Sequence, residues 1–264
     1  MKNKSLFISF YKTLLKSRMQ YKLNFILEIL VNVVTYVTIY LSLFVLFSNF
    51  STLGGWNYHE IIVLYSVNLF TYGVACLFLY IPMTHLENTV VNGEFDSVLI
   101  RPIHPIRYLI MKQSYIGFLS HVVVSVAFFF YGIRHLGLAL DMPDILIFIL
   151  NVLGGVLIQS SIFILFGALS FKYHRVGNLL SLVIYRMRGL TDYPLSIYPA
   201  LIRNLLMLLP PYAFVGFIPV ALLLNQSTPF QAIPLAPFLV GLFAIGMSIF
   251  SFERMILNYS SAGN

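Results

Sequence analysis

The chain has 264 residues, of which 59% are hydrophobic and only 9% carry a charged side chain. Because a soluble domain holds about 25% charged residues, this composition excludes an ordinary soluble protein and predicts an all-α protein that crosses the membrane several times. The net charge of +7 is explained by basic residues in the loops, which fix the orientation of a membrane protein. We therefore expect a lipid bilayer and no nucleic acid as partner.

Residues 1–24 have the pattern of an amphipathic helix that lies on the cytoplasmic surface of the membrane. A helical period puts an apolar face opposite a basic one, formed by Leu6, Phe7, Phe10 and Leu14 against Lys4, Lys12 and Lys16. Basic residues are spread along the segment and do not precede a short cleavable apolar core, so we expect no secretory signal here.

Long apolar runs follow, and each can supply the roughly 20 helical residues that cross a bilayer core. We expect two spans within residues 25–82 (at 25–47 and 60–82), two within 114–171 (at 114–134 and 145–171), and a last span at 234–252. The whole chain, residues 1–264, is then a single transmembrane domain.

The stretch between residues 172 and 230 allows two topologies. In the first, residues 176–192 are the fifth span and residues 193–230 form a re-entrant segment at the outer face, which suits the interruptions at Pro199, Pro210, Pro211 and Pro219. In the second, residues 200–224 are the fifth span and residues 172–199 form a cytoplasmic loop. Both topologies have six spans and both termini in the cytoplasm.

The distribution of Lys and Arg sets the orientation. With the N-terminus inside, twelve of the sixteen lie in the cytoplasm, namely those of residues 1–24 with Arg101, Arg107, Lys112, Lys172, Arg175 and Arg254. The second topology brings Arg186 and Arg188 inside as well, which the preference of basic residues for the cytoplasm favours. The residues alone therefore leave the side of residues 176–199 open.

A charged strip, residues 92–110 with the sequence NGEFDSVLIRPIHPIRYLI, separates the second and third spans within the expected cytoplasmic loop 83–113. Gly93 breaks the preceding helix, Glu94 and Asp96 suit a helix N-terminus, and Pro102 ends the apolar run that follows them. The strip predicts one short surface helix. It is either an ordinary solvated loop or a docking element, because exposed apolar residues beside both signs of charge suit protein contacts.

Two stretches resemble the ABC-2 type transporter permeases, in particular a subgroup of similar length with six spans. The run NGEFDSVLIRPIHPIRY, with its acid-bearing turn and Leu-x-Arg-Pro, is similar to the cytoplasmic loop of that family. The run DYPLSIYPALIRNLLMLLPPYAFVGFIPVALLL at 192–224 resembles its second signature. Both occur in the family's order among the spans, and the resemblance covers nearly the whole chain.

The resemblance implies the permease subunit of an exporter that works by alternating access. A coupling helix in loop 83–113 would insert into a separate ATPase subunit, which implicates Glu94, Phe95, Asp96, Leu99 and Arg101 in coupling. The implied partners are two ABC ATPase subunits, which would bind ATP and Mg, and a second permease, identical or related. The resemblance also implies the outer re-entrant segment and so favours the first topology.

Motifs for catalysis within this chain are missing from the sequence. No Gly-x-x-x-x-Gly-Lys-Ser/Thr occurs, so a P-loop cannot hold ATP here and we expect no cofactor in this chain. The run HEIIV at 59–63 lacks the second His of a zinc-protease helix, so we expect no metal. No spacing joins a nucleophile, a base and an acid, so we expect no catalytic residues.

Polar side chains within the spans are candidates for a substrate pathway, because polar groups at membrane depth are costly and often functional. We assign the pathway to Asn68, Gln159, Ser160, Arg186 and Arg188. Neutral members of this set can equally bond between helices. An ion-coupled secondary carrier is the alternative function, weakened because no pair of acids or acid with His is evident at mid-membrane, and a membrane-embedded enzyme is a further one.

Overall fold

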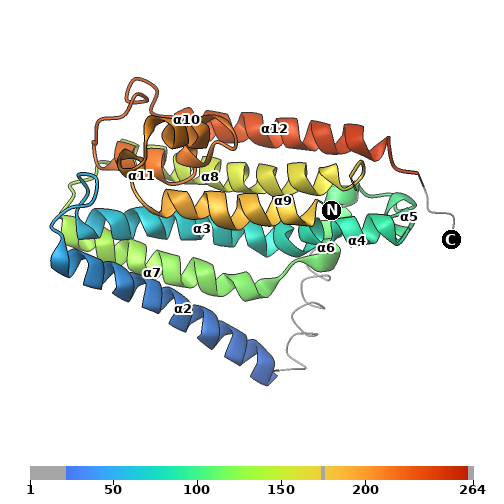
Figure 1. Cartoon of the computed structure of the whole chain (residues 1–264), viewed down its shortest axis with the longest axis horizontal. Coiled ribbons are helices and arrows are strands. Elements are labelled where there is room, and N and C mark those ends of the chain that lie inside the picture. Colours follow the sequence, from blue (N-terminus) through green and yellow to red (C-terminus); the bar gives the residue numbers. More distant parts are fainter. Residues whose placement is uncertain (1–21, 174–175, 261–264) are drawn as a thin grey trace.

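The computed structural model describes residues 22–173 and 176–260, and every regular element within them is helical. The amphipathic helix expected over residues 1–24 lies almost entirely outside the described residues. Figure 1 shows the long helices side by side, running along the longest axis of the molecule. The prediction of an all-α protein is confirmed for the part that the structure describes.

Five helices are long and apolar enough to cross a membrane. They are α2 (Lys22–Asn49), α3 (Tyr58–Thr84), α7 (Leu119–Leu136), α8 (Met142–Leu169) and α12 (Ala236–Ile256). Each coincides with one of the spans expected at 25–47, 60–82, 114–134, 145–171 and 234–252, with ends that differ by a few residues. Helix α3 begins at a capping box, in which the Asn57 side chain accepts from the backbone N–H of Glu60 at 3.0 Å.

The sixth span depends on how a bent segment is counted. Helix α10 (Ala200–Leu208) is followed by η5 (Tyr212–Phe214) and α11 (Phe217–Leu223), and the two halves meet at 76°, as in a broken span or a re-entrant loop. The expected fifth span at 176–192 is helical but short. It consists of α9 (Gly177–Ser181), a π-helical turn η2 (Leu182–Met187) and the 3-10 turn η3 (Leu190–Asp192), and η4 (Leu195–Ile197) follows.

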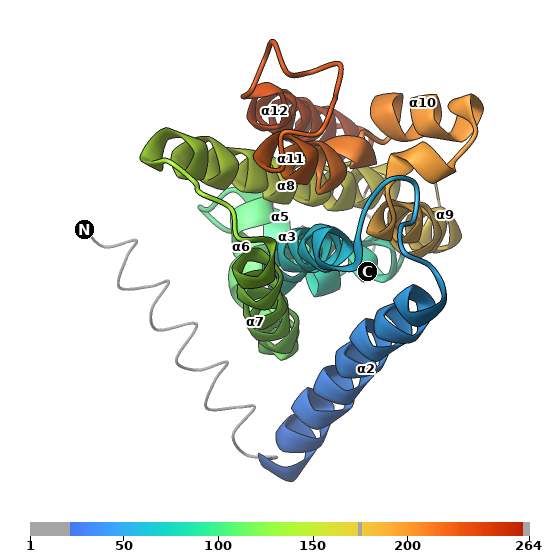
Figure 2. The same ribbon diagram turned by 90° about the vertical axis from the view of Figure 1, so that its left-hand side faces the viewer.

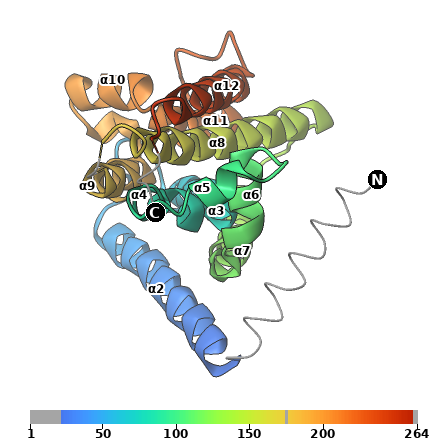
Figure 3. The same ribbon diagram turned by 90° about the vertical axis from the view of Figure 1, so that its right-hand side faces the viewer.

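The two ends of the bundle carry different connections. At one end lie α4 (Leu86–Val91), α5 (Asp96–Leu99), α6 (Pro105–Gln113) and η1 (Ile116–Phe118), close to the end of α12, as Figure 3 shows. At the opposite end the loop after α2 meets the segment after η3, where the Ser196 hydroxyl donates to the Gly54 carbonyl at 2.6 Å. Residues 193–199 therefore lie at the end of the bundle remote from the charged strip.

Helix α3 is the centre of the bundle, with most of its residues buried from Ile61 to Met83. Its neighbours approach it closely because a glycine lies at each contact. A Cβ on Gly132 of α7 would stand 2.7 Å from Val63, one on Gly155 of α8 would stand 3.0 Å from Thr71, and one on Gly167 of α8 would stand 2.8 Å from Met83. Small residues at helix contacts are the usual means of close packing in membranes.

Helix α2 stands apart from this centre. It lies against α7 near its C-terminal end, where the Tyr40 ring stacks on Phe128 and the Tyr40 and Ser66 hydroxyls lie 2.8 Å apart. Toward its N-terminal end it diverges from the other helices, as Figures 1 and 2 show. Most of its apolar side chains are exposed, so lipid or another protein chain must cover them in the membrane.

Helices α8 and α12 cross at a pair of glycines. A Cβ on Gly241 would stand 2.5 Å from the carbonyl oxygen of Gly154 and 2.7 Å from its Cα, so backbone packs directly on backbone. Gly246, one and a half turns further along α12, has open space around a Cβ. The two glycines of α12 therefore form a matched pair, one at a contact and one free of it.

Replacing Gly241 by Ala should destabilise the protein by about 1–3 kcal/mol, because the added methyl group forces the two backbones apart. Gly246→Ala is the control and should leave stability unchanged or raise it by up to about 1 kcal/mol through helix propensity. Thermal unfolding of the purified variants in one detergent measures both. Equal unfolding temperatures for the two variants would contradict the close crossing.

Candidate functional site

A cavity of about 340 Å³ lies where α2 diverges from the bundle. Four segments line it, with Glu28, Asn32 and Tyr36 from α2, Tyr72 and Tyr80 from α3, Tyr115, Gly117, Phe118 and His121 from the start of the third span, and Tyr185 and Arg188 from η2 and its end. Its volume falls in the range of small-molecule sites. The cavity is therefore a candidate binding site within the membrane domain.

The α2 wall follows from the spacing of its polar residues. Glu28, Asn32 and Tyr36 are four residues apart, so they lie on one face of the helix and point the same way. Residues on the other faces, such as Leu30 and Val34, are apolar and exposed. Helix α2 thus presents a polar face to the cavity and an apolar face outward.

Aromatic rings form most of the remaining wall. The ring of Phe118 lies between three tyrosines, with centroid distances of 6.2 Å to Tyr72, 5.0 Å to Tyr80 and 5.7 Å to Tyr115. The Tyr115 hydroxyl donates to the carboxylate of Glu28, so the acid of the cavity already has a donor. The wall is consequently apolar in its body and carries phenol groups at its edges.

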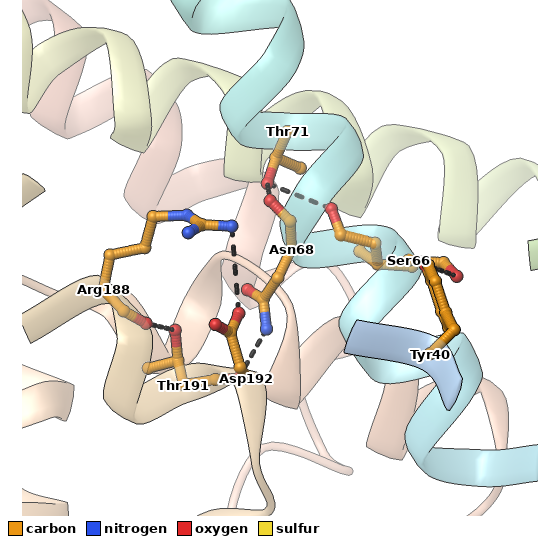
Figure 4. Close-up of polar contacts among 8 residues, drawn as sticks. Tyr40, Ser66, Asn68, Thr71, Arg188, Thr191 and Asp192 are labelled. Atoms are coloured by element: carbon orange, nitrogen blue, oxygen red, sulfur yellow. Dashed lines mark hydrogen bonds and ion pairs between the residues drawn. The ribbon is translucent and has the colours of Figure 1, made fainter. Parts of the chain in front are cut away.

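Arg188 is the basic group of the cavity. Its guanidinium carbon lies 4.3 Å from the centroid of the Tyr72 ring, a cation–π contact. Its Nη2 atom lies 3.8 Å from Oδ1 of Asp192, one helical turn further on, with only 13% and 17% of the two side chains exposed. At that distance the pair, drawn as a dashed line in Figure 4, has a favourable charge interaction without a hydrogen bond. Nε and Nη2 of Arg188 bond no described residue.

Asn68 fixes the turn that carries this ion pair. Its side-chain amide donates to the carbonyl of Thr191, and the Thr191 hydroxyl donates to the carbonyl of Arg188 at 2.7 Å (Figure 4). The backbone at Gly216 packs so tightly against the Asn68 amide that a Cβ there would overlap it. Asn68 therefore holds Arg188 and Asp192 in place from the central helix without lining the cavity.

The residues assigned from the sequence to a substrate pathway are not all together. Arg188 lines the cavity and Asn68 lies behind it. Gln159 is buried in α8 and Ser160 is half-buried beside it. Arg186 is exposed and lines a neighbouring pocket with Ser181, Leu182 and Tyr185, and Tyr185 also lines the cavity. The pathway as a set stays a prediction, and the structure adds the tyrosines and Glu28. The signal in the sequence that could have identified this wall is Glu28, an acid in an otherwise apolar run and four residues before Asn32.

The charged strip was predicted to hold one short helix, and the structure has two helical elements there. The single turn of α5 ends before Pro102, as expected, and α6 begins within the strip at Pro105. Glu94, Leu99 and Arg101 are exposed and Asp96 is half-buried. Phe95 is fully buried, with its ring 4.8 Å from that of Phe171 and 5.3 Å from that of Tyr259. Phe95 thus fixes the strip to the ends of α8 and α12, while its neighbours face outward.

A direct connection runs from this end of the bundle to the cavity. Oε2 of Glu87, in α4, accepts from the backbone N–H groups of Val176 and Gly177, both at 2.9 Å. These groups begin α9, where a carboxylate both bonds free N–H groups and complements the helix dipole. Helix α9 continues into η2 and ends at Arg188. A movement of α4 would therefore be passed to the start of the segment that carries Arg188.

Comparison with known proteins agrees with this architecture. The family model described as ABC-2 family transporter protein matches residues 33–263, which is most of the chain. No curated protein and no solved structure gives a significant match. Among the described residues, no three His, Cys, Asp or Glu side chains gather as a metal ion would require.

Replacing Glu87 by Ala should loosen the start of α9 without unfolding the bundle. Hydrogen bonds to a charged group contribute about 1.5–3 kcal/mol each, so amide hydrogen exchange over residues 176–181 should rise roughly tenfold or more. Asn88→Ala, an exposed neighbour on α4, is the control and should leave this exchange unchanged. Equal exchange rates in the two variants would show that Glu87 does not hold α9.

Proposed function

Because this chain belongs to the ABC-2 family of transporter proteins, we propose that it is the membrane-spanning subunit of an ATP-binding-cassette exporter. In this proposal two permease chains, identical or related, enclose a pathway, and two separate ATPase subunits bind ATP and Mg. The chain moves an amphiphilic substrate outward by alternating access. The family as a whole works with such ATPases, and the chain has no P-loop of its own.

The connection through Glu87 is the observation that carries this proposal. A coupled transporter needs a surface that an ATPase can push, a cavity that can change, and a rigid path between them. The charged strip supplies the surface, and the cavity at Arg188 is the cavity that can change. Residues 86–91 supply the path from the strip to the cavity, through the two hydrogen bonds that Glu87 accepts at the start of α9.

The exposed face of the strip suits docking to another protein. Leu99 is 42% exposed and Ile100 is 79% exposed, and Glu94 and Arg101 in the same strip are exposed as well. Apolar side chains surrounded by charges of both signs match the anatomy of a protein interface, in which burial gives affinity and charge gives orientation. Phe95 is buried beneath this face against Phe171 and Tyr259, so a displacement of the strip would move the ends of α8 and α12 with it.

Alternating access requires that ATP binding favour one conformation of the permease. The nucleotide can shift the equilibrium only by its differential affinity for the two states, so the strip must be held differently in each. The cavity is placed to respond, because it lies between α2, which has few internal contacts, and the segment that begins at α9. The exposed apolar face of α2 is a contact for lipid or for the second permease.

The opposite ends of the bundle support an orientation. The strip and the end of α12 lie together at one end, which we assign to the cytoplasm with both termini. The loop after α2, residues 193–199 and the segment after α11 lie at the other end, which we assign to the outside. This agrees with the first of the two topologies, with the bent pair α10 and α11 as the outer re-entrant segment.

A secondary carrier is the second candidate, and the ion pair at Arg188 favours it. Asp192 is an acid largely buried inside the bundle beside a base, and such a pair can couple ion movement to transport. The two functions differ in one result. Transport by a carrier would persist after deletion of every partner ATPase and would be lost in Asp192→Asn, whereas the proposed exporter would stop without its ATPase.

Replacing Leu99 by Asp should abolish coupling while leaving insertion intact, because the residue lies outside the spans. A charge in the centre of a docking face should weaken copurification of the ATPase by roughly tenfold or more, and transport should fall with it. Leu257→Asp is the control, since Leu257 is 75% exposed at the same end of the bundle but outside the strip. Normal transport by Leu99→Asp at normal expression would refute docking through the strip.

The orientation is tested by cysteine labelling in a Cys76→Ser background. A Cys at Ser196, which is exposed, should react with a membrane-impermeant thiol reagent added to intact cells. A Cys at Ser97, exposed in the strip, should react only after the cells are opened. The reverse pattern would invert the orientation, and labelling of both positions only in opened cells would support the second topology.

A further inference from the structure

Arg188 has hydrogen-bonding capacity that the described chain does not use. Two of its three guanidinium nitrogens, Nε and Nη2, are closed off from solvent and from the space of the cavity, and they bond no described residue. A buried donor without an acceptor costs free energy, and a buried guanidinium costs more. Asp192 compensates the charge from 3.8 Å, but its Oδ1 atom does not accept a hydrogen bond from Arg188. The chain therefore keeps an expensive cation beside the cavity without satisfying it.

The other charged group of the cavity does not have this deficiency. Glu28 accepts a hydrogen bond from the Tyr115 hydroxyl, and it comes from α2, on a different wall from Arg188. The remaining lining groups that carry polarity are phenols, an amide and one histidine. Beside the cavity, Nε and Nη2 of Arg188 therefore lack an acceptor, and Oδ1 of Asp192, 3.8 Å from Nη2, lacks a donor. Among the residues that line the cavity itself, the unmet demand is the one that Arg188 makes for an acceptor.

We propose that the cavity binds an amphiphile with a flat aromatic or apolar body and an anionic oxygen group, which Arg188 binds. This rests on the proposed function, because it names the substrate class of the same cavity. A carboxylate or phosphate offers two oxygens at the spacing of the guanidinium fork. Because Nε and Nη2 are enclosed in this structure, the guanidinium must turn toward the cavity on binding, and it then gives up its long contact with Asp192 for charge-assisted hydrogen bonds to the ligand. The rings of Tyr72, Tyr80 and Phe118 pack on the ligand body.

A matched set of three probes tests the charge preference. The chain alone, in nanodiscs of phosphatidylcholine, is titrated with 1-pyrenebutyrate, with the neutral 1-pyrenebutanol, and with the cation 1-pyrenebutyl-trimethylammonium. Binding is corrected for partition into empty nanodiscs. Pyrenebutyrate should bind at least about tenfold more tightly than the other two. Equal affinity for all three probes, or preference for the cation, overturns the proposal.

Substitution of the arginine assigns the preference to one side chain. Arg188→Gln should remove the tenfold advantage of pyrenebutyrate and leave binding of pyrenebutanol unchanged. Arg203→Gln is the control, because Arg203 is exposed on α10. This variant should bind all three probes as the unsubstituted chain does. If Arg188→Gln is not monodisperse, Arg188→Lys replaces it, and loss of the fork should weaken pyrenebutyrate by at least about threefold. Unchanged selectivity in the folded variant overturns the proposal.

A lipid headgroup carries the same anionic chemistry as a free amphiphile, and a second titration separates them. Nanodiscs that contain phosphatidylglycerol should compete with pyrenebutyrate if an anionic lipid is the ligand, and should not compete if it is a free amphiphile. Both results require Arg188. These measurements use no ATPase, so selective binding with no ATPase copurification would refute the exporter alone, and copurification without selective binding would refute this inference alone.

Discussion

The bundle depends on burying one helix, α3, on nearly every side. Lipid gives no hydrophobic force between helices, so they must be held by close packing and by a few polar contacts. Glycines at Gly132, Gly155 and Gly167 let α7 and α8 approach α3, and the backbone at Gly216 packs onto Asn68. The elements around α3 are consequently placed by contact with one common surface, and a shift of one of them alters the others.

This arrangement explains why the polar groups of the membrane domain are concentrated at a few points. The ion pair between Arg188 and Asp192, the Asn68 amide and the tyrosine cavity all lie where η2 and η3 meet α3. A π-helical turn lies directly before them, and such turns are frequent at functional sites because they displace the helix from its regular bonding. The buried ion pair therefore lies where the helix is irregular, whereas Asn151 and Gln159 are buried in the regular helix α8.

The charged strip and the cavity are connected by backbone as much as by side chains. Helix α3 continues almost directly into α4, and Glu87 of α4 bonds the start of the segment that ends at Arg188. The strip itself is fixed by Phe95 and by an exposed contact between His104 and Glu253, 3.2 Å apart. For the proposed transport cycle, a force at the strip has a short and ordered route to the cavity.

The sequence by itself determined the membrane class, the positions of five spans and the place of the charged strip. These follow from local properties, because the length of an apolar run and the position of a Pro or a cap act within one segment. The polar spacing of Glu28, Asn32 and Tyr36, which was not among the sequence predictions, marks one face of α2, but the period of a helix does not say what that face meets. Only the tertiary structure decided that it meets Tyr72 and Arg188 across a cavity. It also placed Gln159 away from that site, placed Arg186 in a neighbouring pocket and buried Phe95, since these outcomes depend on which helices pack together and not on any one of them.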